Sequence, residues 1–245
     1  MAHITDLPNE LLLMIYPHLP LQALIASRGV CRKWRNLASV SHIHPTRRKL
    51  LGLYESFVHS PAFLATRPLI EPHLCSFDRE AYVSALPEST PDDLRMWLLE
   101  WPARAAIACL WPGLDSKFNM SQDIFASRRD ARNCLTPKPA VHNLDLALCN
   151  GTAHVSALEV FDEGNGWRHW VVLDGKLGDE DLRGCVYSKV RGDDGTAGYG
   201  ESLEAKCWLG YLQTEVSNEQ ARLEQTGLYC PCQACQDRAL DLLAP

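Results

Sequence analysis

The sequence predicts an α+β fold, with helices in the first half and then a small antiparallel sheet with a helix packed against it. Two patterns support this prediction. Apolar residues recur every three or four positions through much of residues 1–110, the period of an amphipathic helix. Between residues 155 and 173, two apolar runs flank the turn-forming sequence 162–166, which is typical of a β-hairpin.

Three short helices are expected within residues 1–45. The first presents residues at the i, i+3, i+4, i+7 spacing of one helical face: Leu12, Ile15, Tyr16 and Leu19. Pro17 has no N–H to donate, so it should end or kink this helix near Tyr16. Pro20 then opens a second helix, which Gly29 breaks. A third helix carries the stripe Val30, Trp34 and Leu37.

Further helices are expected in residues 46–112. One spans Thr46 to Val58, and another is capped by Ser76 and runs through Ala85. Thr90-Pro91-Asp92-Asp93 predicts a helix start, because it combines a cap, a first-turn proline and two acids. Pro102 ends that helix, and the Ala-rich stretch to Leu110 is either a further helix or a buried strand. Residues 113–150 are interpreted as a connecting segment with one short helix around 122–131.

The pattern changes to strands after residue 150. We predict a hairpin from residues 155–161 and 167–173, ended by Asp174-Gly175, and a further strand over 184–190. Glu201 should then open a helix whose apolar stripe packs on the sheet: Ala205, Trp208, Leu209, Leu212 and Val216.

Composition restricts the class of protein. The 245 residues are 46% hydrophobic and 22% charged, which is ordinary for a globular chain. No run of 18 apolar residues is present, and the N-terminus lacks the basic and apolar regions of a signal peptide, so we expect an intracellular protein, cytoplasmic or nuclear, that is neither secreted nor membrane-spanning. The ten cysteines are therefore expected to be reduced.

Charge is unevenly distributed along the chain, whose net charge is −6. Residues 1–50 hold seven Lys/Arg and two Asp/Glu, whereas residues 151–245 hold eight and sixteen. The acidic second half argues against nucleic acid as a partner. The basic side chains of the first half could steer an acidic protein partner or could form a solvated helix face: Arg28, Arg32, Lys33, Arg35, Arg47, Arg48 and Lys49.

The ordered string Leu7-Pro8, Glu10-Leu11-Leu12, Ile15, Leu19-Pro20-Leu21, Leu24 and Val30-Cys31-Arg32-Lys33-Trp34-Arg35 resembles the F-box, a helical module that binds a Skp-type adaptor and, through it, a cullin ubiquitin ligase. Periodicity by itself would equally fit the first part of one all-helical core. The resemblance implies that the following residues bind the adaptor: Leu7, Pro8, Leu11, Leu12, Ile15, Leu19, Leu21, Leu24, Val30, Cys31 and Trp34.

A second resemblance involves the sheet region. The order Ala157-Leu158-Glu159-Val160, Gly166-Trp167, Gly184-Cys185-Val186-Tyr187 and Cys207-Trp208-Leu209 resembles the SUKH superfamily, which includes fungal cell-wall-assembly regulators. The segments Trp97 to Pro102 and Trp111 to Leu114 also resemble such fungal chains. The His-Asn-Gly-like turn that is usual in this family is not evident in the sequence.

Few residues point to chemistry. Cys230, Cys232 and Cys235 are candidate zinc ligands, but they supply three of the four that a tetrahedral site needs, so no bound metal or other cofactor is predicted. His169 is interpreted as a cross-strand packing residue and not as a base. We find no nucleophile or acid–base pair in the sequence, and we therefore do not expect an enzyme.

These observations predict four regions: an F-box over residues 1–45, a helical linker over 46–112, a connecting segment over 113–150 and an α+β sheet domain over 151–245. The predicted function is that of a substrate receptor in a Skp–cullin–F-box ubiquitin ligase, binding a protein substrate through its C-terminal part. One alternative is a non-degradative interaction protein that uses the F-box only for assembly. Another is an enzyme whose site lies in the sheet domain.

Overall fold

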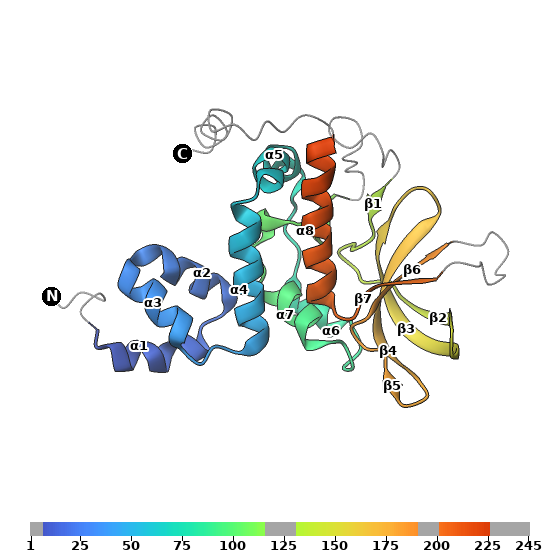
Figure 1. Ribbon diagram of the computed structural model, residues 1–245, viewed down its shortest axis with the longest axis horizontal. Helices are drawn as coiled ribbons and strands as arrows, with labels where there is room; N and C mark the ends of the chain where they lie inside the picture. The colour runs from blue at the N-terminus through green and yellow to red at the C-terminus, as the bar shows by residue number, and fades with distance from the viewer. Residues whose placement is uncertain (1–6, 116–130, 191–200, 226–245) are drawn as a thin grey trace.

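The computed structural model describes residues 7–115, 131–190 and 201–225. Figure 1 shows three layers in sequence order: the N-terminal helices α1–α3, a second group of helices that includes α4, α5 and α7, and a curled antiparallel sheet, with the long helix α8 between the second group and the sheet. The fold class is therefore α+β, as predicted.

The first layer comprises α1 (Asn9–Ile15), a 3₁₀ turn η2 (Tyr16–His18), α2 (Leu21–Val30) and α3 (Arg32–Val40). Pro17 lies in the 3₁₀ turn where the sequence predicted the end of the first helix, and Pro20 directly precedes α2. The predicted break at Gly29 was wrong. The helix continues to Val30, and the break falls at Cys31, whose backbone is extended with φ −164°.

The second layer contains α4 (Pro45–Val58), α5 (Pro61–Ile70), η3 (Glu71–His73), α6 (Arg79–Ser84) and α7 (Asp92–Glu100). Helix α4 confirms the helix predicted over 46–58. The cap predicted at Ser76 was wrong, because α6 begins later and the Asp78 carboxylate accepts the Ala81 N–H at 3.0 Å. Thr90 does not cap α7 either, since its hydroxyl donates to the Pro87 carbonyl.

The Ala-rich stretch after α7 forms neither of the two structures considered for it. It contains the short 3₁₀ turn η4 (Ala103–Ala105) and then a tight turn in which the Leu110 N–H donates to the Ile107 carbonyl. Ala108 and Cys109 have φ of 47° and 71°, in the left-handed region that interrupts a helix or a strand. This turn is fully buried, so tertiary packing overrides the helical preference of alanine.

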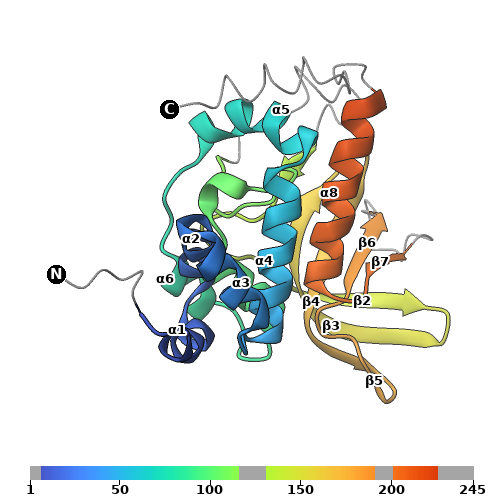
Figure 2. The same cartoon turned by 60° about the vertical axis from the view of Figure 1, so that its left-hand side comes forward.

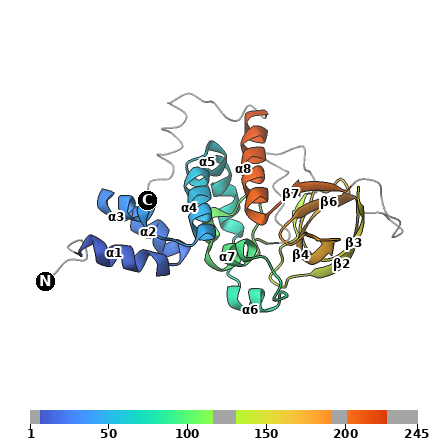
Figure 3. The same ribbon diagram turned by 60° about the horizontal axis from the view of Figure 1, so that its bottom comes forward.

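Within the described residues the sheet has seven strands: β1 (Arg132–Asn133), β2 (Val141–Leu148), β3 (Gly151–Asp162), β4 (Trp167–Leu177), β5 (Glu180–Asp181), β6 (Val186–Val190) and β7 (Ser202–Ala205). The main path runs β1-β3-β4-β6-β7; β2 also pairs with β3, and β5 pairs with β4. Figure 3 shows how the sheet curls on itself. The predicted hairpin is confirmed by β3 and β4, and the predicted strand over 184–190 by β6.

Several strand positions differ from the predictions. Strand β2 occupies part of the segment interpreted as connecting, while the helix predicted around 122–131 lies almost entirely outside the described residues. Strand β4 continues beyond Asp174-Gly175, because Gly175 at φ +151° fits where a Cβ would come within 2.6 Å of Val155. Residues Ser202–Ala205 form β7 and not the start of a helix, so α8 (Trp208–Gln225) begins later than predicted.

The core is continuous from the first layer to the sheet. One apolar cluster includes Leu21 and Leu24 of α2, Leu50 of α4, Trp97 of α7 and Val171 of β4. A second, smaller cluster fills the other face of the curled sheet, around Trp170 and Val172. Because buried side chains link α2 to α4 directly, the N-terminal helices are packed onto the rest of the chain and do not stand apart from it.

Helix α7 joins its neighbours through a carboxylate near each end. Glu100 accepts the Leu21 N–H at the start of α2 at 2.8 Å and pairs with Arg47 of α4 at 2.7 Å. Asp93 accepts the Leu209 N–H at the start of α8 at 3.1 Å. Both carboxylates therefore satisfy a first-turn amide of another helix, where the helix dipole also favours a negative charge.

Helix α8 buries a titratable group against α5. Glu219 is fully buried, and Thr66 and the Ala108 backbone face its carboxyl. Neither makes a well-formed hydrogen bond with a Glu219 oxygen. Burial raises the pKa of Glu219 to about 7, against smaller opposing effects of these two groups.

The Glu100 contacts predict a measurable loss of stability. We expect Glu100→Ala to lower the free energy of unfolding by about 2 kcal/mol, because it leaves the partly buried Arg47 without its carboxylate and the Leu21 N–H without its acceptor. Glu100→Gln should cost less, since the amide oxygen can still accept from Leu21. Urea denaturation measures both, with the exposed Glu88→Ala as a control within roughly 0.5 kcal/mol of wild type. Equal stability of Glu100→Ala and Glu88→Ala would contradict this account.

Glu219 predicts a pH dependence of stability. The raised folded-state pKa means that its contribution is fully present below the unfolded pKa of about 4.3 and is lost as pH rises through about 7. The stability gained by Glu219→Gln over wild type should therefore grow by about 3 kcal/mol between about pH 4.5 and pH 8. Chemical denaturation at both pH values measures it, and the exposed Glu224→Gln on the same helix should show no such change. If the stability difference between Glu219→Gln and wild type does not change with pH, the Glu219 carboxylate is ionised in the core at both pH values.

Candidate functional site

Helix α1 exposes an apolar face. Leu11, Met14 and Ile15 lie at i, i+3 and i+4, and their side chains are 46%, 68% and 44% exposed. We call these three residues the α1 apolar face. Leu12 and Tyr16 point the other way and are buried. Helix α1 is therefore apolar on both sides. One side packs into the core, and the other is uncovered within the described residues.

The other predicted adaptor-binding residues fall into three groups by exposure. Pro8 and Val30 are exposed, and Leu7, Leu19, Cys31 and Trp34 are partly buried. Leu12, Leu21 and Leu24 are buried in the common core. In this conformation they support the exposed residues of the same helices by packing. Direct contact of any of these residues with an adaptor stays a prediction.

Met14 is the residue that the sequence analysis missed. The periodicity analysis grouped Ile15 with Leu12 and Tyr16 on one face, whereas the structure separates them, with Ile15 facing solvent. The run Leu11-Leu12-Leu13-Met14-Ile15 is apolar without interruption, so it contains two overlapping helical stripes. The i, i+3 spacing of Leu11 and Met14 could have predicted the second, exposed stripe.

Trp34 of α3 links the helices of this module. Its ring packs edge-to-face on Tyr16, with centroids 6.4 Å apart, and the Tyr16 hydroxyl donates to the Trp34 carbonyl at 3.0 Å. The indole Nε1 is buried without a hydrogen-bond partner among the described residues. Trp34 therefore positions α1 relative to α3 and is itself partly buried.

The basic residues near the N-terminus are not equivalent. Arg47 and Arg28 pair with Glu100 and Glu55, and Arg48 donates to the carbonyls of Ser39 and Ser41. Four other side chains are exposed: Arg32, Lys33, Arg35 and Lys49. Any steering of an acidic partner would rest mainly on these four.

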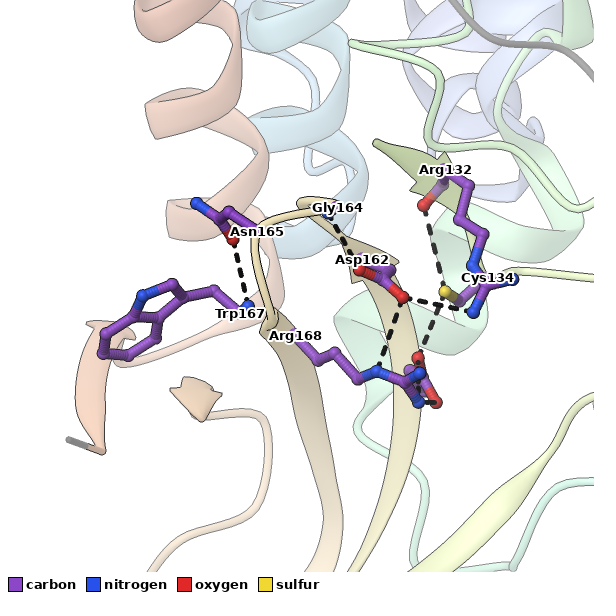
Figure 4. A network of polar contacts seen from close by, with 8 residues as sticks. Arg132, Cys134, Asp162, Gly164, Asn165, Trp167 and Arg168 are labelled. Atoms are coloured by element: carbon purple, nitrogen blue, oxygen red, sulfur yellow. Dashed lines mark hydrogen bonds and ion pairs between the residues drawn. The ribbon is translucent and has the colours of Figure 1, made fainter. Parts of the chain in front are cut away.

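A network of charged side chains lies beside the β3–β4 turn (Figure 4). Arg168 of β4 reaches both Glu159, at 3.0 Å, and Asp162, at 3.4 Å, on β3. Asp162 also pairs with Arg132 of β1 at 3.2 Å. The two cations balance the two acids, so this network attaches β1 to the hairpin and leaves no surplus charge for a ligand.

Of the nucleophile candidates near this network, Cys134 is not activated. Cys134 donates to Glu159 at 3.3 Å, and burial, with that carboxylate, raises the pKa of its thiol to about 12. The Ser188 hydroxyl donates to Glu204 at 2.6 Å. His169 is buried between Glu163 and the Tyr211 hydroxyl, each 3.0 Å from one ring nitrogen. His169 thus packs within the sheet layer, as the sequence predicted, and also forms a polar link between β4 and α8.

The described ranges contain neither a metal-binding cluster nor a membrane-spanning helix. Within residues 7–115, 131–190 and 201–225, no group of three or more His, Cys, Asp or Glu side chains is arranged to hold a metal ion. The candidate ligands Cys230, Cys232 and Cys235 lie outside these ranges. None of the helices described there combines the length and apolar character needed to cross a membrane.

Comparison with known proteins identifies the N-terminal module. The F-box-like family model matches residues 4–44, which include α1, α2 and α3. This match supports an F-box protein and gives no support to a SUKH domain or a fungal type. Searches of curated proteins and of solved structures found no match.

The packing of Trp34 predicts a combined effect on stability and binding. Truncating a buried Trp costs about 3–5 kcal/mol, so for this partly buried ring we expect Trp34→Ala to cost about 2 kcal/mol. It should also reduce recovery of a Skp-type adaptor in pull-downs. Trp34→Phe, which keeps an aromatic ring against Tyr16, should restore most of both. A wild-type melting temperature for Trp34→Ala would show that this contact is unimportant.

Proposed function

We propose that this chain is a substrate receptor of a Skp–cullin–F-box ubiquitin ligase, in which the F-box-like domain binds a Skp-type adaptor and the remaining layers bind a protein substrate. The observation that carries the proposal is the α1 apolar face within the matched domain. Three adjacent large apolar side chains on one helix are typical of a surface that a protein partner covers.

The position of the domain in the fold supports this role. The adaptor-facing helix α1 belongs to a module whose core continues into α4 and α7, and Glu100 connects α7 to α2. A substrate held by the later layers would therefore keep a defined position relative to the adaptor. Other subunits would transfer ubiquitin, and this chain would contribute by holding the substrate close to them.

We include in this proposal that the chain itself performs no chemical step. The protonated Cys134 thiol is in keeping with it. A cullin-dependent change in the half-life of a bound partner would distinguish a degradative receptor from an F-box protein that only assembles complexes.

The α1 apolar face predicts which substitutions weaken adaptor binding. Burying one large apolar side chain contributes roughly 1.5–3 kcal/mol, and a buried carboxylate adds a penalty, so Ile15→Asp should weaken binding of a recombinant Skp-type adaptor by about 30-fold or more. Met14→Asp should act in the same direction. Isothermal titration calorimetry measures the affinity.

The matched control is Leu203→Asp on β7. Leu203 is 45% exposed, compared with 44% for Ile15, but it lies in the sheet layer at the opposite side of the molecule (Figure 1). We expect it to leave adaptor affinity within about twofold of wild type. If Ile15→Asp and Leu203→Asp bind adaptor equally well, the α1 apolar face is not the contact surface.

A further inference from the structure

An open groove lies between the F-box-like domain and the second layer. It has a volume of about 700 Å³ and is lined by α2, α4, α5, the first residue of α6 and the segment after α7. Figure 2 shows α2, α4 and α5, the three helices that contribute most of its walls. We call it the α2–α5 groove. Much of the lining is apolar, including Ile25, Val58, Phe63 and Leu64.

Three arginines also line the α2–α5 groove: Arg67, Arg79 and Arg104. No Asp or Glu is among its lining residues. Glu71, outside the lining, lies 3.6 Å from the Arg67 Nε and 3.3 Å from the Arg104 Nε, so one carboxylate serves two cations. An apolar groove with a surplus of positive charge is complementary to a segment that combines apolar and acidic side chains.

Arg79 is the most informative of the three. Its guanidinium packs over the Trp111 ring at 4.9 Å and donates to the Leu98 and Leu99 carbonyls at the end of α7. No carboxylate of the described residues lies within 4.0 Å of it, although the side chain is only partly exposed. These contacts hold Arg79 in a fixed place with its charge not neutralised.

Arg67 adds an unused donor. Its Nε is buried and has no hydrogen-bond partner among the described residues, since Glu71 stays beyond bonding distance. A buried donor left unpaired costs free energy, which a carboxylate entering the groove would recover. Tyr54 lines the same groove.

We infer that the α2–α5 groove binds a peptide segment of the substrate in which Asp or Glu side chains alternate with large apolar ones, the carboxylates pairing with Arg67, Arg79 and Arg104. This inference rests on the proposed function in calling the bound segment a substrate. Binding of the segment itself needs only the full chain, without the adaptor. Its outcome is therefore separate from the adaptor titration.

Fluorescence polarisation with labelled nine-residue peptide pools tests the chemistry of the ligand. The first pool alternates Asp/Glu with Leu/Ile/Phe, the second replaces the acids by Asn/Gln, the third replaces the apolar residues by Ser/Gly, and the fourth replaces the acids by phosphoserine. We expect the first pool to bind at least about tenfold more tightly than the second and third, and its binding to weaken as salt rises. No binding, equal binding of the first two pools, or binding of the phosphoserine pool alone would overturn the inference.

Variants of the full chain test the location. Ala26 is exposed on α2 and lines the groove, so Ala26→Trp should fill it and reduce binding of the first pool by about tenfold or more. Arg104→Glu, at a side chain that is 77% exposed, should reduce it several-fold. The control is Arg183→Glu in the sheet layer, where an exposed arginine also pairs with one acid, Asp181. All three should melt like wild type, and an unchanged affinity of Ala26→Trp or an equal loss in Arg183→Glu would place the binding elsewhere.

Discussion

The arrangement of the layers depends on α7 and on the two carboxylates near its ends. Asp93 accepts from the first turn of α8, and Glu100 accepts from the first turn of α2 while pairing with Arg47. Glu100 replaces the local cap that α2 lacks, since Pro20 supplies no side-chain acceptor. Asp93 adds to the local cap of α8, where the Cys207 Sγ accepts the Gly210 N–H at 3.3 Å. Between the two acids, the buried Trp97 packs edge-to-face on Trp111 and Trp208. One short helix thus sets the position of both the F-box-like domain and the helix that covers the sheet.

This constraint explains how a three-helix module of about forty residues stays ordered. A unit of this size buries too little surface to be stable by itself. Here Leu21 and Leu24 are buried in a cluster shared with α4 and α7, so one side of the module is covered by the same chain. The α1 apolar face is exposed within the described residues. In the proposed function, the two sides of the module have separate roles, internal attachment and adaptor binding.

Helix α2 connects the proposed adaptor surface with the proposed peptide groove. Leu21 and Leu24 face the core, while Ile25 and Ala26 line the α2–α5 groove. Because both surfaces are built on one packed module, the distance between a bound adaptor and a bound segment would be set by side-chain packing and not by a linker. In contrast, the charges near the β3–β4 turn pair with one another and attach β1 to the hairpin: Arg132, Asp162, Arg168 and Glu159.

Local sequence signals determined much of this protein. The fold class, the end of α1 before Pro17, α4 and the β3–β4 hairpin follow from periodicity, proline and turn residues, because each depends on interactions within a few residues of the chain. The ordered residues from Leu7 to Arg35 were enough to predict the F-box-like domain that the family model matches. Where those signals conflicted with packing, they failed: the Ala-rich segment became a buried turn, and Glu201 was followed by a strand.

Tertiary structure alone decided which apolar and charged side chains remain available. Leu12 and Ile15 have similar hydrophobicity and share one predicted stripe, yet only Ile15 is exposed, because the packing of Tyr16 against Trp34 sets the rotation of α1. Arg47 and Arg79 are both arginines of helix starts, but Glu100 neutralises the first, whereas no carboxylate of the described residues reaches the second. Such differences arise from contacts between residues far apart in the chain, which composition and spacing do not encode.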